Sequence, residues 1–277
     1  MVQTSVTPIT VYTFNGSDSA EKQDFLAREE PLEIRIEYGP VTQRICKNLS
    51  VTMRTPGADE DLVRGFLFTE GIIGGSADLQ QVQALDENIQ LAKLDPDAAF
   101  DLQRLERHFY TSSSCGVCGK TSIDAVKTNS ACPTPNTKTL IIDPQVIYTL
   151  PETLRHAQDT FTLTGGLHAA ALFDLAGRLI AVREDVGRHN ALDKLIGHFL
   201  QNQTVPLQES MLLLSGRASF ELLQKAAMAG IRVVCAVGAP SSLAVATAQS
   251  FGIALIGFLR GERFNLYTKP DFLSFKH

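Results

Sequence analysis

Two cysteines, Cys115 and Cys118, stand two residues apart in a polar stretch rich in serine and glycine, residues 112–120. A cysteine acts as a nucleophile, metal ligand or redox partner only as its thiolate, and a cation such as Lys120 lowers the pKa of a neighbouring thiol. The other three of the five cysteines lie in apolar runs or in a proline-containing loop. The pair is therefore the first candidate for chemistry.

Three kinds of chemistry fit a Cys-x-x-Cys pair. A zinc site needs two more ligands, for which Cys132 and the six histidines are the candidates, but a second paired motif is missing. A thioredoxin-like dithiol usually carries bulky or proline residues between its cysteines, whereas this spacer is Gly116-Val117. A sulfur or acyl carrier needs one exposed thiol on a mobile loop, which glycine and serine supply. The composition favours the carrier, with ordinary loop cysteines as the alternative.

The overall composition is that of a globular protein. A length of 277 residues with 44% hydrophobic content suits one large or two modest domains. The formal charge of -5 gives no net attraction to nucleic acid or to an anionic membrane. The N-terminus lacks the features of a signal peptide, and no apolar run approaches the ~18 residues of a membrane span. We therefore expect a cytoplasmic protein with reduced thiols that binds neither nucleic acid nor membrane.

The first half predicts a tail and a small domain. Residues 1–27 are rich in polar groups and are expected to be partly ordered at most. Residues 28–138 predict an α+β domain that carries the cysteine pair near its end, with a hairpin turn at Gly39-Pro40 and a proline-containing linker at its boundary. Its predicted strands are 32–38, 45–53, 82–85 and 89–94, and its helix begins near Asp59 and ends at Gly71.

Residues 139–277 predict a second domain with a parallel sheet. Short apolar strands alternate with helices in the order βαβαβ, and strands without polar alternation are typical of a parallel sheet buried on both faces. An earlier pair of strands around a turn at Gly177, followed by a helix, extends the sheet. The predicted strands are 170–174, 179–182, 211–214, 231–237 and 253–259, and the predicted helices are 190–200, 218–229 and 241–251.

Three loops of this domain could bind a ligand, because ligands of such sheets collect at the carboxyl ends of the strands. Glycines allow close backbone approach, and Arg217, Arg260 and Arg263 can pair with phosphate oxygens. We therefore predict a nucleotide or another phosphorylated ligand. The alternative is that the serines and glycines only cap helices and the arginines are only solvated. The three loops are residues 215–219, 238–242 and 260–264.

Two further places carry ionisable side chains. Residues 184–190 contain acidic side chains, a basic side chain and an imidazole just before a predicted helix. Asp185 or His189 could therefore bind a ligand or carry protons. Charged residues at a helix start also act simply as dipole partners. His168 follows the glycine pair Gly165-Gly166, which would let a ligand approach, and a buried histidine with satisfied hydrogen bonds is an equal alternative.

Five segments carry a family resemblance. They are residues 70–73 (EGII), 115–119 (CGVCG), 165–170 (GGLHAA), 184–195 (EDVGRHNALDKL) and 215–221 (SGRASFE). Together they resemble the formate dehydrogenase accessory sulfurtransferases, the FdhD family. The segments run in the family's order and span nearly the whole chain beyond the N-terminal tail, so they are far more specific together than Cys-x-x-Cys alone.

The resemblance implies a sulfur carrier. Such a protein takes persulfide sulfur from a cysteine desulfurase and passes it to the molybdenum bis(molybdopterin guanine dinucleotide) cofactor before the cofactor enters formate dehydrogenase. Matched onto this sequence, Cys115 would carry the persulfide and Cys118 would assist. The residues then expected to bind the cofactor, or a guanine nucleotide such as GDP at the same site, are Phe258, Leu259, Arg260, Gly261, Glu262 and Arg263, together with Ser215, Gly216, Arg217, Ser219 and His189.

The resemblance also implies the fold, which is α/β, or α+β overall. We expect a cytidine-deaminase-like three-layer C-terminal domain, a smaller α+β N-terminal domain and a homodimer. Deamination itself is not expected, because His168-Ala169-Ala170 replaces the His-Ala-Glu of deaminases and the Pro-Cys-x-x-Cys zinc motif is missing. No metal site is predicted. The alternatives are a zinc-binding or cofactor-holding chaperone without sulfur transfer, and a stand-alone dithiol redox protein.

Overall fold

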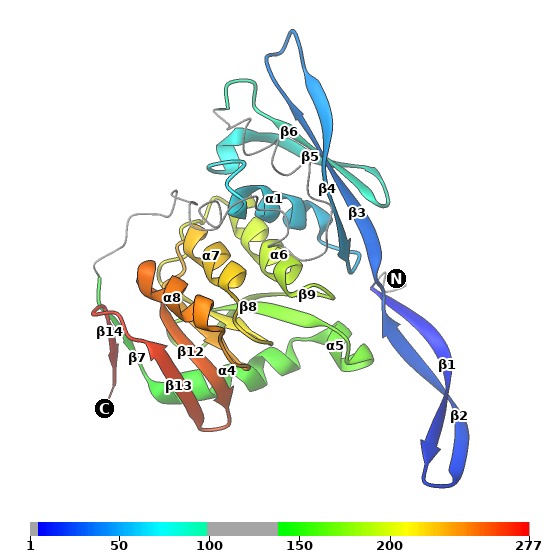
Figure 1. Ribbon diagram of the computed structural model, residues 1–277, viewed down its shortest axis with the longest axis vertical. Helices are drawn as coiled ribbons and strands as arrows, with labels where there is room; N and C mark the ends of the chain where they lie inside the picture. The colour runs from blue at the N-terminus through cyan, green and yellow to red at the C-terminus, as the bar shows by residue number, and fades with distance from the viewer. Residues whose placement is uncertain (1–4, 99–137, 277) are drawn as a thin grey trace.

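The computed structural model describes residues 5–98 and 138–276, which Figure 1 shows in colour. Cys115, Cys118, Lys120 and Cys132 lie outside the described residues, so the predictions made for them stay predictions. The described chain forms a mixed α/β structure, as predicted. It contains a four-stranded sheet, a six-stranded sheet, a short two-stranded pairing and a two-stranded arm.

The four-stranded sheet belongs to the N-terminal part. Its order is β4-β3-β6-β5, and it confirms the four predicted strands and the predicted hairpin, since β3 and β4 pair antiparallel. Alternation along β3 buries Leu32, Ile34 and Ile36. The strands are β3 (Glu30–Tyr38), β4 (Ile45–Arg54), β5 (Leu79–Asp86) and β6 (Ile89–Leu94).

Helix α1 (Asp59–Thr69) covers this sheet, and it too was predicted. Its first turn holds three acidic residues, which interact favourably with the helix dipole, and Gly71 follows its end with a φ of 70°. The start of α1 is fixed by Arg54, whose buried guanidinium donates two hydrogen bonds of 3.0 Å to the carboxylate of Asp59. Helix and sheet therefore form one packed unit.

The six-stranded sheet forms the C-terminal part, in the order β13-β12-β11-β10-β8-β9. Its centre confirms the predicted βαβαβ unit, since β10, β11 and β12 are parallel and α7 and α8 connect them. Strand β8 lies antiparallel to β10, and an unpredicted edge strand, β13, lies antiparallel to β12. The elements are β8 (His168–Asp174), β9 (Leu179–Asp185), β10 (Ser210–Leu214), α7 (Phe220–Met228), β11 (Val233–Ala236), α8 (Ser242–Ser250), β12 (Ala254–Arg260) and β13 (Arg263–Thr268).

Helices cover both faces of this sheet (Figure 1). One face packs on α6 (Arg188–Gln201), α7 and α8, and the other on α4 (Pro144–His156) through Ile147, Leu150 and Leu154. This agrees with three layers, while the closer likeness to cytidine deaminases stays a prediction. None of the described helices is long and apolar enough to cross a membrane. Elements that the sequence did not predict are α4, α5 (Asp159–Thr164), β7 (Leu140–Ile142) and β14 (Leu273–Phe275).

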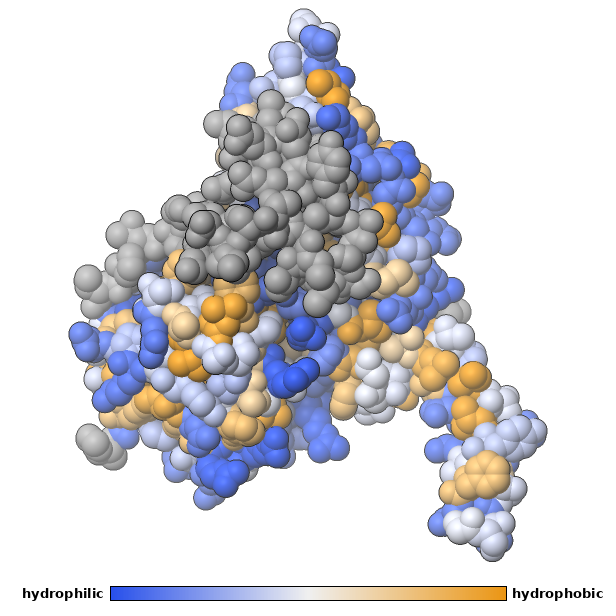
Figure 2. All heavy atoms as spheres, in the orientation of Figure 1, coloured by the Kyte–Doolittle hydropathy of each residue, from blue (hydrophilic) through white to orange (hydrophobic). Residues whose placement is uncertain are grey.

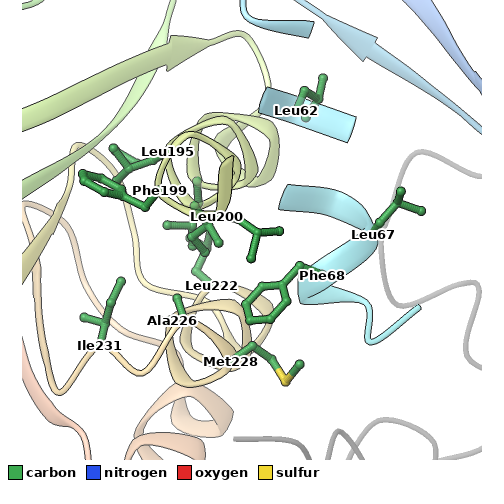
Figure 3. Close-up of a cluster of buried hydrophobic side chains, with 14 of the residues drawn as sticks. Leu62, Leu67, Phe68, Leu195, Phe199, Leu200, Leu222, Ala226, Met228 and Ile231 are labelled. Atoms are coloured by element: carbon green, nitrogen blue, oxygen red, sulfur yellow. The ribbon is translucent and has the colours of Figure 1, made fainter. Parts of the chain in front are cut away.

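The N-terminal and C-terminal parts share one hydrophobic core, which Figure 3 shows between α1, α6 and α7. Leu62 and Phe68 of α1 belong to the same cluster as Leu222 of α7. Helices α1 and α6 cross closely because each carries a glycine at the crossing. A Cβ on Gly65 would overlap the carbonyl oxygen of Asp193, and one on Gly197 would overlap that of Asp61. These contacts do not test the predicted domain boundary near residue 138.

Residues 6–27 correct one prediction. They form an antiparallel hairpin, β1 (Val6–Asn15) and β2 (Asp18–Ala27), that stands away from the body of the molecule as an arm (Figure 1). The expectation of a partly ordered tail was wrong because it rested on polar composition alone. That expectation did not consider the β-branched and aromatic residues of β1, which favour a strand, or the turn at Gly16, whose φ is 64°.

Candidate functional site

The three loops predicted to bind a ligand lie side by side at the carboxyl ends of β10, β11 and β12. The N–H of Gly238 donates to the carbonyl of Gly216 at 3.0 Å, and the N–H of Phe258 donates to the carbonyl of Gly238 at 3.1 Å. Gly238 is needed here, since a Cβ would lie 3.0 Å from Cγ of Arg217. These bonds join the first two predicted loops to each other and to the end of β12, while the meeting of the third predicted loop, residues 260–264, with the other two stays a prediction. We call this the loop edge: residues 215–219, 238–242 and 258–263.

The serines of the loop edge have different roles. Ser241 caps α8, because its Oγ accepts from the N–H of Ala244 at 3.1 Å, and Ser215 Oγ accepts from the N–H of Ala169 at 2.8 Å. Ser219 precedes α7, yet its buried Oγ bonds to none of the described residues. Helix capping therefore explains Ser241 but not Ser219. The N-terminal N–H groups of α7 can donate hydrogen bonds to an anionic ligand.

Three arginines give the loop edge its positive charge. Arg217, Arg260 and Arg263 are all exposed, and the last two face each other where β12 meets β13. Gly261 and Glu262 form the exposed turn between them, and Gly261 takes the left-handed conformation with a φ of 52°. Exposed guanidinium groups attract anions and can hold phosphate oxygens with two parallel hydrogen bonds.

Phe258 and Leu259 differ in their suitability for ligand contact. Phe258 is half-buried and has a φ of 53°, a conformation that costs a non-glycine residue about 1–3 kcal/mol and is concentrated at functional sites. The guanidinium of Arg260 lies 6.0 Å from the Phe258 ring centroid. Leu259 has no exposed surface and packs into the core on the α4 side of the sheet. The predicted contact of Leu259 with a ligand therefore finds no support in its position.

His189 joins the loop edge from the start of α6. Its Nε2 lies 2.8 Å from Oε2 of Glu221 in the first turn of α7. The hydrogen bond from His189 outweighs burial and holds the pKa of Glu221 below its ordinary value. Sequence reasoning gave Glu221 no role, because an acidic residue in a first helical turn is usually only a dipole partner. The pair fixes the two helix N-termini relative to each other.

His168 opens β8 at the same edge of the sheet. A Cβ on Gly216 would lie 3.4 Å from the Nδ1 of His168, so the imidazole is close to the first loop. Burial, followed by the charges of Arg188 and His189, lowers the pKa of His168, and only Asp185 opposes the shift. His168 is therefore a neutral imidazole at pH 7, able to donate one hydrogen bond and accept another.

Asp185 has a structural role. It is fully buried, and its carboxylate accepts from the N–H of Thr55 at 3.1 Å and from the N–H of Gly187 at 2.8 Å. Nζ of Lys194 lies 2.7 Å from the same carboxylate. Ligand binding or proton transfer by Asp185, which the sequence left open, would require breaking these bonds. The residue instead ties the end of β4 to the start of α6.

A cleft of about 610 Å³ adjoins the His189–Glu221 pair, between β4, α1 and the starts of α6 and α7. Lys225 lies in its wall, where Nζ donates to Asp193 at 2.9 Å, to Glu70 at 3.0 Å and to the hydroxyl of Thr69 at 2.8 Å. Burial lowers the pKa of Lys225, but the charges of Asp193 and Glu70 outweigh it and raise the pKa. Sequence reasoning missed this network.

Comparison with known proteins finds relatives over nearly the whole chain. The model of the FdhD/NarQ family matches residues 27–274. A protein named sulfur carrier protein FdhD from Streptomyces coelicolor is 49% identical over 259 residues, which are 90% of this chain and 89% of that protein. One of the same name from Mycobacterium tuberculosis is 48% identical over 263 residues, with 90% and 92% covered.

A more distant relative and a solved structure extend the comparison. The sulfur carrier protein FdhD of Sulfurisphaera tokodaii is 40% identical over 266 residues, with 95% of this chain and 97% of that protein covered. The solved structure, from Desulfotalea psychrophila, is assigned as a formate dehydrogenase accessory protein. It shares 21% identity, covers 97% of this chain and 99% of its own, and has a TM-score of 0.75, so it supports the fold. This chain belongs to the FdhD/NarQ family.

Proposed function

We propose that this protein is a sulfur carrier, which accepts persulfide sulfur from a cysteine desulfurase at Cys115 and delivers it to the molybdenum bis(molybdopterin guanine dinucleotide) cofactor of formate dehydrogenase. The observation that carries the proposal is the Cys115-Gly116-Val117-Cys118 motif in a chain that belongs to the FdhD/NarQ family and is 49% identical to a named sulfur carrier. The name of the solved neighbour supports the formate dehydrogenase part.

The loading step is a thiol–persulfide exchange. The thiolate of Cys115 attacks the terminal sulfur of the donor persulfide, the sulfur–sulfur bond of the donor breaks, and the donor cysteine leaves as a thiolate. The terminal sulfur keeps its proton as it moves to Cys115. The step therefore needs no external oxidant or reductant. Cys118 would assist by sharing the sulfur or by resolving a mixed disulfide.

The loop edge would hold the guanine nucleotide part of the cofactor, which is the substrate of the transfer. Arg217, Arg260 and Arg263 can pair with its phosphates. Gly216 and Gly238 let His168 and Arg217 pack closely against the loops, and the buried hydroxyl of Ser219, which bonds to none of the described residues, lies next to the start of α7. The hydrogen-bond donors of the loop edge and the positive charge of its arginines both fit an anionic nucleotide.

Calorimetric titration with GDP tests the nucleotide part. We expect Arg217→Ala and Arg260→Ala each to weaken GDP binding about tenfold, since one charge-assisted hydrogen bond contributes roughly 1.5 kcal/mol. The control is Arg178→Ala, because Arg178 is also exposed but lies at the turn between β8 and β9, at the opposite end of the sheet's strands, where it pairs with Asp174. Equal affinity in all four proteins would contradict this ligand assignment.

Restoration of formate dehydrogenase activity tests the transfer itself. In cells that lack their own carrier, we expect the wild-type protein to restore activity, Cys115→Ala to restore none and Cys118→Ala to restore part of it. The ranking follows from the assignment of Cys115 as the sulfur-bearing residue. Complete loss in both variants would refute the ranking, and full activity of Cys115→Ala would refute the proposed mechanism.

A further inference from the structure

His168 is an ionisable side chain beside the loop edge to which the proposed function gives no task. Two hydrogen bonds fix its place on β8. The N–H of Ser215 donates to the carbonyl of Ala169 at 3.0 Å, and the N–H of Ala169 donates to Oγ of Ser215 at 2.8 Å. A Cβ added to Gly216 would lie 3.4 Å from Nδ1 and 3.5 Å from Cε1 of the imidazole. The ring of His168 therefore lies directly against the backbone of the first loop.

The imidazole of His168 has no hydrogen-bond partner in the part of the chain that the structure describes. Burial and neighbouring charges act on it, but no hydrogen bond from a described residue does. Polar groups that are withdrawn from water are usually hydrogen-bonded, and an imidazole has two nitrogens to satisfy. The alternative of a histidine with satisfied hydrogen bonds is therefore not what residues 5–98 and 138–276 show. Both ring nitrogens are available to a ligand.

The charged groups that act on His168 come from two neighbouring elements. Arg188 and His189 at the start of α6 favour the neutral imidazole, as burial does, and Asp185 at the end of β9 favours the charged form. The carboxylate of Asp185 is itself matched by Nζ of Lys194 at 2.7 Å. Without a ligand, the surroundings of His168 are therefore more positive than negative, and the ring stays neutral at pH 7.

A phosphorylated ligand at the loop edge would reverse this balance. Figure 2 shows hydrophilic residues gathered at the lower edge of the molecule, where β12 turns into β13, and this turn carries Arg260 and Arg263. Arg217 adds a third exposed guanidinium next to Gly216, the residue that the imidazole of His168 touches. A phosphate held in the first loop brings negative charge to the imidazole. An opposite charge at this range favours the imidazolium, which donates a hydrogen bond from each nitrogen.

We propose that His168 is a ligand-binding residue that holds the phosphate part of the nucleotide as an imidazolium, taking up a proton from solvent as the ligand binds. The inference rests on the nucleotide site proposed at the loop edge. Since the pKa of His168 is lowered in the free protein and raised by the anion, the complex holds more protons than the free protein between these two pKa values. Affinity should therefore rise as pH falls through this interval, by at most about tenfold per pH unit, and stay constant above it.

Calorimetric titration with GDP in buffers of different ionisation enthalpy measures the protons taken up on binding. We expect wild type to take up protons and to bind more tightly at about pH 6.5 than at about pH 8. His168→Gln keeps a hydrogen-bond donor but cannot be protonated, so it should match wild type at about pH 8 and bind more weakly than wild type at lower pH. The phosphate itself titrates near pH ~6 in every protein, so the difference between proteins reports His168. The matched control is His198→Gln, at the other end of α6, which should behave as wild type.

Nitrogen NMR of the wild-type imidazoles gives a second readout that needs no variant. One ring should change from neutral to imidazolium when GDP is added, and guanosine, which lacks phosphate, should cause no such change. A His168→Gln protein with the pH dependence of wild type, an equal loss of affinity at every pH, a His198→Gln protein that loses the proton uptake, or no change of any ring with GDP would overturn the role of His168. Binding of GDP to wild type without proton uptake would contradict this role alone, whereas no GDP binding at any pH would contradict the nucleotide site and this inference together.

Discussion

The crossing of α1 and α6 allows one sharp prediction, the effect of Gly197→Ala. The added methyl group would overlap the carbonyl oxygen of Asp61 and lie 2.7 Å from the backbone nitrogen of Gly65. Both are backbone atoms, which cannot rotate away as a flexible side chain would. The helices must therefore move apart, and with them the walls of the cleft that α1 and α6 supply.

The magnitude follows from two opposing effects. Overpacking of a well-packed contact costs about 1–3 kcal/mol, and a contact with backbone lies at the upper end. Alanine regains up to ~1 kcal/mol over glycine in helix propensity. We therefore expect the free energy of unfolding to fall by about 2 kcal/mol. With a urea m-value of about 3 kcal/mol/M for a chain of this size, the midpoint should fall by roughly 0.7 M.

Urea unfolding followed by circular dichroism measures this shift. Gly75→Ala is the control, since an added Cβ there meets no heavy atom within 4 Å and the extended φ of -177° suits any residue. The control should remain within ~0.5 kcal/mol of wild type. A Gly197→Ala protein with the wild-type midpoint would refute the close crossing and the shared core built on it.

Three further predictions concern buried charge and thiols. Lys225→Met should lower the free energy of unfolding by about 3–5 kcal/mol, because it leaves the buried carboxylate of Asp193 without its cation. The lowered pKa of Glu221 means that its pair with His189 stabilises the fold above the ordinary value of 4.5 and that this contribution is lost as pH falls through the lowered pKa. Glu221→Gln should therefore differ most from wild type near neutral pH. Burial raises the pKa of Cys235 to about 12, so native alkylation should spare it and modify exposed Cys46.

Each of these predictions has its own check. Lys138→Met removes an exposed ion pair with Glu209 and should cost at most ~1 kcal/mol in the same urea experiment, so equal losses would contradict the role given to Lys225. For Glu221→Gln, a difference from wild type that stays constant between acid and neutral pH would contradict the shift. Peptide mapping that finds Cys235 alkylated as fast as Cys46 in the native protein would contradict its burial.

The periodicity of apolar residues in the sequence predicted those elements whose pattern is complete within a short segment of the chain. Helix α1 and the βαβαβ unit were both expected, because the first has an apolar face and acidic first turn and the second has continuous apolar strands. The loop edge was expected for the same reason, since the loops follow parallel strands. The arm was missed because its order depends on pairing between β1 and β2 rather than on burial.

The cleft could not be predicted, because its contacts are long-range. Lys225 meets Thr69 across 156 positions and Asp193 across 32. In the sequence, a lysine in an amphipathic helix is typical of a solvated face, and nothing nearby indicates the buried carboxylate of Asp193 or the half-buried one of Glu70 beside it. The role of Ser219 shows the same limit. Its position before α7 predicts a cap, and only the structure shows a hydroxyl that caps nothing.

Intact mass spectrometry after incubation with a cysteine desulfurase and cysteine tests the central claim most directly. Wild type should gain one or more sulfur atoms, about 32 Da each, in a form that reductant removes. Cys115→Ala should gain none, while Cys118→Ala and Cys46→Ala should still gain sulfur. A wild-type protein that takes up no sulfur, or a Cys115→Ala protein that takes up as much as wild type, would contradict the account of this protein as a carrier that loads at Cys115.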